Sequence, residues 1–108
     1  MLFRSDGCKT IGDFAFCYCE KLTNVYLPSE LTQIGHGAFT SCNIKSIKLP
    51  SKLKKVGFKA FRNNILSAII IPESVEELGS CAFEDNEIDY FEIKSDIKSI
   101  PEGLFKNC

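Results

Sequence analysis

A six-residue pattern recurs five times in this 108-residue chain and constrains its fold more than any other feature. Each copy has a branched aliphatic residue, a glycine or proline, two variable residues, a small residue or leucine, and a phenylalanine. The closing residues are Phe16, Phe39, Phe61, Phe83 and Phe105, which are 23 residues apart once and 22 residues apart thereafter. A fixed period in this range predicts a solenoid of stacked coils. Such a fold offers a repeated surface more readily than an enclosed catalytic pocket.

Each unit also contains a short strand. In the second unit Val25 and Leu27 alternate with Tyr26, which is the period of a strand with one buried face. Pro28 follows and ends the strand, because proline cannot donate a hydrogen bond to a central ladder. We therefore predict an α/β solenoid with a short-stranded parallel sheet on one face and short helices or turns on the other. The stacked phenylalanines would fill the core between them.

Composition excludes several classes of function. The formal net charge is −1, so no bulk field favours nucleic acid or an anionic membrane surface. No apolar run approaches the roughly 20 residues of a membrane span. The first residues lack the layout of a signal peptide, since Arg4 follows at once after three apolar residues. We predict neither nucleic-acid binding nor direct insertion into a membrane.

The full repeat, L-x-x-I-x-L-P-x-x-L-x-x-I-G-x-x-A-F-x-x-C/N, resembles the BspA-like (Treponema-type) class of leucine-rich repeats. Residues 22–42, 44–64 and 66–86 match it almost throughout. We interpret residues 1–108 as a single leucine-rich repeat domain of about five units of 22–23 residues, part of a larger array. The resemblance implies surface-displayed or secreted proteins linked to adhesion and protein binding. It supplies no catalytic residues.

Cysteine and asparagine share one position, three residues after each phenylalanine. The residues there are Cys19, Cys42, Asn64, Asn86 and Cys108. This alternation predicts a buried turn at which a small polar group bonds to the backbone. The position of Cys17, shared with Thr40 and Glu84, is expected to be exposed, and Cys81 partly exposed.

A metal or catalytic site is the sharper alternative for the cysteines. Cys17, Cys19 and His36 could ligate zinc, but the paired C-x₂₋₄-C spacing typical of structural zinc is absent. A nucleophilic Cys–His pair would lack a third, orienting group. His36 stands at a variable surface position of the repeat. We therefore predict no metal, no cofactor and no enzymatic activity.

Charges are unevenly distributed, with basic residues between positions 45 and 62 and acidic residues between 73 and 92. A basic patch for nucleic acid is one interpretation. The repeat favours another, because stacked coils place opposite charges next to each other. Exposed pairs of this kind contribute about 0.2–1 kcal/mol each. The expected pairs are Lys54 with Glu76, Lys55 with Glu77, and Arg62 with Glu84, with Lys106 stacked beyond Glu84.

Outward strand positions would line the concave sheet, where a protein partner would bind. The predicted binding residues are Tyr26, Lys48, Ile70, Tyr90 and Glu92. The tyrosines and Ile70 have no core to fill on that face, and tyrosine is enriched in interfaces. Two functions stay open: an adhesion or protein-binding module, and a structural spacer or self-stacking segment without a ligand. Self-association through uncapped ends belongs to the second, because solenoids need polar caps.

Overall fold

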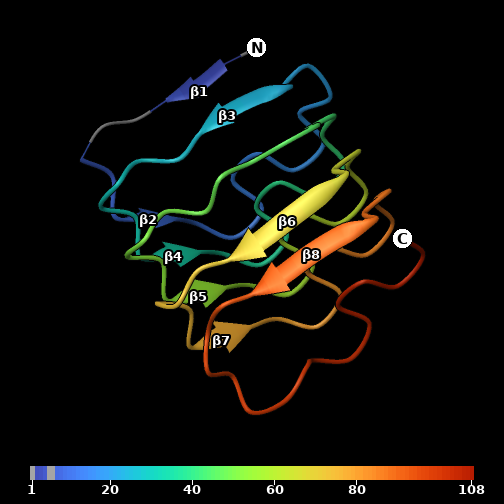
Figure 1. Cartoon of the computed structure of the whole chain (residues 1–108). Coiled ribbons are helices and arrows are strands. Elements are labelled where there is room, and N and C mark those ends of the chain that lie inside the picture. Colours follow the sequence, from blue (N-terminus) through green and yellow to red (C-terminus); the bar gives the residue numbers. More distant parts are fainter. Residues whose placement is uncertain (1, 5–6) are drawn as a thin grey trace.

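The computed structural model describes the backbone of residues 2–4 and all of residues 7–108. The chain winds into stacked coils, with the N- and C-termini at opposite ends of the stack (Figure 1). Every strand pairing is parallel, as predicted. The strands are β1 (Leu2–Arg4), β2 (Thr10–Ile11), β3 (Asn24–Tyr26), β4 (Gln33–Ile34), β5 (Lys55–Val56), β6 (Ala68–Ile71), β7 (Glu77–Leu78) and β8 (Tyr90–Ile93).

The predicted sheet forms at both ends of the stack but not in its middle. β1 pairs with β3, and β6 pairs with β8 in the expected register, with Ile69 opposite Phe91 and Ile71 opposite Ile93. The strand expected around Ile47 is not formed, and this prediction was wrong. Leu49 is still buried, so the segment keeps its place in the core without joining the ladder.

A second sheet, which the sequence analysis did not predict, runs through four coils in the order β2-β4-β5-β7. Its strands have two residues each, and within β2, β4 and β5 the first is exposed and the second buried. Ile34 pairs with Ile11 on one side and with Val56 on the other. The aliphatic residue of each six-residue pattern is therefore a strand residue whose side chain enters the core.

Turns, rather than helices, form the wall that carries the phenylalanines. The predicted helices are not found among the described residues. Two positions in each unit have a left-handed backbone, as at Lys59 with φ of 57° and Asn63 with φ of 59°. An α-helix requires a continuous right-handed backbone, so left-handed residues four apart exclude it. The coils instead bond to one another, as where the Phe61 amide donates to the Ala82 carbonyl at 2.8 Å.

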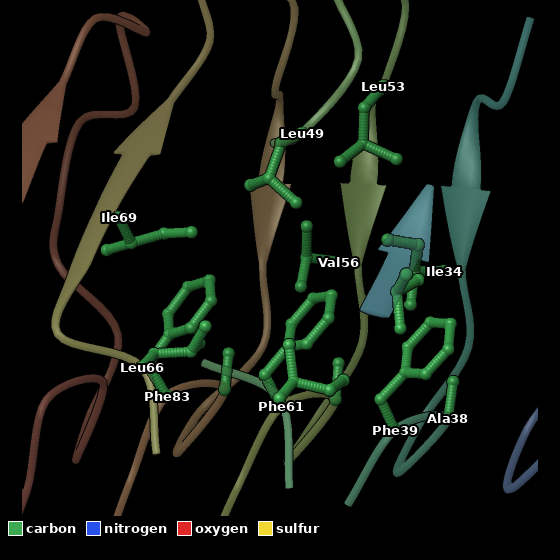
Figure 2. Close-up of a cluster of buried hydrophobic side chains, with 14 of the residues drawn as sticks. Ile34, Ala38, Phe39, Leu49, Leu53, Val56, Phe61, Leu66, Ile69 and Phe83 are labelled. Atoms are coloured by element: carbon green, nitrogen blue, oxygen red, sulfur yellow. The ribbon is translucent and has the colours of Figure 1, made fainter. Parts of the chain in front are cut away.

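The five phenylalanines form one stack along the solenoid, which confirms the predicted register. Ring centroids are 5.3 Å apart from Phe16 to Phe39 and from Phe39 to Phe61, 5.5 Å from Phe61 to Phe83 and 6.0 Å from Phe83 to Phe105. Figure 2 shows the three central rings side by side beneath aliphatic side chains of both strand layers. These three are fully buried, whereas the terminal two are half-buried.

The shared cysteine and asparagine position is the predicted backbone-bonding site. Asn64 Nδ2 donates to the carbonyls of Phe39 at 2.8 Å and Phe61 at 3.1 Å, and its Oδ1 accepts from the Ile44 amide at 3.1 Å. Asn86 repeats this arrangement one coil later. Cys42 Sγ donates to the Phe16 carbonyl at 3.2 Å, which is the bond a thiol can reproduce. The side chain therefore ties each coil to the preceding one.

Replacing Asn64 by alanine is expected to lower the free energy of unfolding by about 2 kcal/mol, because the buried Ile44 amide loses its acceptor and the Phe39 carbonyl loses this donor. Asn64→Cys keeps a donor and should cost about half as much. Urea denaturation followed by circular dichroism measures both. The exposed Asn24→Ala is the matched control, and equal midpoints for all three variants would contradict the assigned role.

The charge pairing is confirmed in part. Arg62 Nε lies 3.0 Å from Glu84 Oε2, Lys106 Nζ lies 3.9 Å from Glu84 Oε1, and Lys55 Nζ lies 3.8 Å from Glu77 Oε1. Within residues 7–108, no ion pair joins Lys54 to Glu76. Glu84 and Thr40 are buried, so the exposure predicted for their position was wrong; Cys17, at the same position, is half-buried. Glu84 tolerates burial because cations from both neighbouring coils reach it.

Candidate protein-binding face

The outward side chains of the first strand of each unit form one surface, here called the strand face. It consists of β3, β6, β8 and the extended segment 45–49 between β3 and β6. Its described outward residues are Asn24, Tyr26, Ser46, Lys48, Ala68, Ile70, Tyr90 and Glu92. Period-two alternation places them outward, because their immediate neighbours in each strand supply the core side.

Large apolar groups lie open on the strand face. Tyr26 is 62% exposed, Ile70 47% and Tyr90 54%. A strand residue that points away from the core would need no apolar side chain for folding, and single exposed apolar residues are common. Here three of them lie on one face around shared hollows, which is the arrangement that marks an interaction surface.

Two hollows lie on the strand face, one on each side of segment 45–49. The first has a volume of about 590 Å³ and lies between the segment and β3; Tyr26 and Lys48 line it. The second has a volume of about 730 Å³ and lies between the segment and β6; Lys48, Ile70 and Tyr90 line it. Pro50 borders the first and Pro72 the second.

Segment 45–49 accounts for both hollows. Its peptide groups make no hydrogen bond to any other described residue. In Figure 1 the segment is the green trace that crosses between β3 and β6 without an arrow. Because the segment does not join the ladder on either side, the edges of β3 and β6 that face it are also unpaired within the described chain.

The electrostatics of the strand face come from few groups. Tyr90 Oη donates to Glu92 Oε2 at 3.2 Å, and this bond to the carboxylate raises the pKa of the Tyr90 hydroxyl. Lys48 and Lys94 line the second hollow, and neither forms an ion pair with another described residue. Glu73 is the acid at the same hollow. The free cations leave this hollow with one net positive charge.

The five residues predicted from sequence are therefore distributed over the two hollows. Lys48 lies between them, Tyr26 on the first, and Ile70 with Tyr90 on the second. Glu92 lines neither hollow and contributes through its bond to Tyr90. The sequence analysis missed Lys94 and Glu73. Both lie just past the end of a strand, and the regular spacing after strands could have indicated them.

The cysteines and His36 have structural roles instead. His36 Nδ1 accepts a hydrogen bond from the Phe58 amide at 2.9 Å, so the side chain closes a turn of the next coil. Burial raises the pKa of the Cys42 thiol to about 11, which disfavours the reactive thiolate. Across residues 7–108, no group of three or more side chains is arranged to hold a metal ion. No described helix is long and apolar enough to cross a membrane.

The comparison with known families agrees with this geometry. A sequence model of the BspA type leucine rich repeat region matches residues 3–108 in six copies. The chain belongs to the BspA-type leucine-rich repeat family. Leucine-rich repeats are generally protein-interaction modules, and the repeat itself is a non-enzymatic fold.

One solved structure extends the comparison to three dimensions. A leucine-rich repeat protein from Bacteroides ovatus is similar to this chain, with a TM-score of 0.91 and 34% sequence identity. The alignment covers 99% of this chain and 28% of that protein, so the BspA-type repeats described here span just over a quarter of its length. A search among curated proteins found no match.

Proposed function

We propose that this BspA-type repeat domain is a protein-binding module whose strand face contacts the partner. The observation that carries the proposal is the exposure of Tyr26, Ile70 and Tyr90 around two adjoining hollows. Tyrosine anchors in hollows supply much of the binding energy of protein interfaces. Adhesion at a cell surface or outside the cell is the setting we propose, in line with the family resemblance.

The double variant Tyr26→Ala with Tyr90→Ala tests this function. Wild-type protein is immobilised, a panel of extracellular and cell-surface proteins is screened, and affinities of the binders are measured by surface plasmon resonance. We expect the double variant to weaken binding by about a hundredfold, since anchor residues contribute about 2 kcal/mol or more when truncated. Tyr18→Ala, on the turn wall, is the matched control. A partner whose affinity survives the double substitution would refute the proposal.

Self-stacking is the second candidate, and it is favoured by the last coil. Phe91 is 52% exposed and Ile100 57%, although both stand at positions that are buried in earlier coils. A copy stacked on this end would cover them. Light scattering coupled to size exclusion distinguishes the two functions: a mass that rises with concentration supports stacking, and a monomer at all concentrations contradicts it.

A further inference from the structure

Two unpaired backbone edges border the larger hollow of the strand face. β6 pairs with β8 along one edge, and no described strand occupies its other edge. Segment 45–49 lies on that side, with peptide groups that bond to no described residue. The hollow of about 730 Å³ is lined by both. An unpaired strand edge is a template on which another chain can add as a strand.

The side chains around this hollow indicate what kind of chain would fit. Ile70 and Tyr90 offer exposed apolar surface on the β6 side. Lys48 and Lys94 bring two cations without ion-pair partners among the described residues, against the single acid Glu73. Complementary charge at an interface sets partner choice and favours an acidic ligand here.

We propose that an extended peptide segment of a partner, with alternating acidic and apolar side chains, adds as a strand to the free edge of β6 in this hollow. The inference rests on the proposed binding function and names the partner's chemistry. The ligand backbone bonds to β6, its apolar side chains contact Ile70 and Tyr90, and its carboxylates pair with Lys48 and Lys94. The four residues of β6 span about 13 Å at roughly 3.3 Å each, which suits a ligand strand of about four to six residues.

The direct test uses a blocked hexapeptide in which valine and glutamate alternate, and a counterpart with lysine in place of glutamate. Each peptide is titrated into labelled wild-type protein and followed by nuclear magnetic resonance. We expect the glutamate peptide to bind about tenfold more tightly, from two unscreened charge pairs. It should also slow hydrogen exchange of amides within residues 68–71, because strand addition uses backbone groups. Equal affinities, or binding without slowed exchange, would overturn the proposal.

A matched pair of variants tests the charge argument. Lys48→Glu reverses a cation on the hollow, whereas Lys45→Glu makes the same change in net charge at an exposed residue that does not line it. We expect Lys48→Glu to abolish or reverse the tenfold preference for the glutamate peptide, and Lys45→Glu to keep it. The same loss in both variants would mean that overall charge, not this hollow, selects the peptide, and the proposal would fail.

The experiment separates this inference from the proposed function. If neither peptide binds while a protein partner still depends on Tyr26 and Tyr90, the strand-addition proposal is rejected and the binding function stands. If the glutamate peptide binds as described but no protein depends on the two tyrosines, the site at β6 is supported and the wider tyrosine-anchored interface is rejected.

Discussion

Replacing Phe61 by alanine is expected to lower the free energy of unfolding by about 3–5 kcal/mol, a large share of the stability of a domain this small. The ring is fully buried and stacks against Phe39 at 5.3 Å and Phe83 at 5.5 Å. Alanine would lose both contacts and leave a cavity at the centre of the stack. The surrounding coils cannot close this cavity, because backbone hydrogen bonds between the coils fix their spacing.

Denaturant unfolding of Phe61→Ala and Phe105→Ala measures this effect. Phe105 occupies the same repeat position but is half-buried in the last coil, so its removal should cost about half as much. An unchanged midpoint for Phe61→Ala would contradict the register from which the fold was inferred. Equal losses in both variants would contradict the difference in burial between the middle and the end of the stack.

The repeat period was sufficient to predict the parallel coils, the phenylalanine stack and the backbone-bonding turn of Asn64 and Asn86. These features depend on contacts between equivalent positions of successive units, and a period records such contacts directly. The strand at Ile47 was predicted for the same reason and did not form. Its sequence is as regular as that of β6, so pairing there is decided by the fit between neighbouring coils rather than by local pattern.

The sequence missed the second sheet and the exact nature of the turn wall for a different reason. A strand of two residues, such as Gln33–Ile34, is too short to show an alternation that can be recognised. The left-handed residues of the wall include Lys59 and Asp85, which do not indicate a positive φ by type. At the candidate site, the side-chain positions on the strand face could be read from the alternation, but the hollows could not, because they result from the missing ladder.

Replacing Gly57 by alanine is expected to cost at least about 3 kcal/mol, through overpacking against backbone that cannot move aside. A methyl group on Gly57 would lie 2.5 Å from the His36 amide nitrogen, 2.6 Å from the Gly35 carbonyl carbon and 2.8 Å from its oxygen. The Gly57 amide donates to the Ile34 carbonyl at 2.9 Å, so any shift that relieves the clash also strains this bond between coils. Differential scanning calorimetry should show a clearly lower melting temperature.

Gly12 provides the matched control, because it is the equivalent residue of the first coil and a methyl group there would meet no atom within 4 Å. Gly12→Ala should change the free energy of unfolding by no more than about 0.5 kcal/mol. If it destabilises the protein as much as Gly57→Ala, the repeated glycine serves its own turn and not the approach of the preceding coil. A large loss confined to Gly57→Ala means that this glycine sets the distance between coils, on which the phenylalanine stack and both sheets depend.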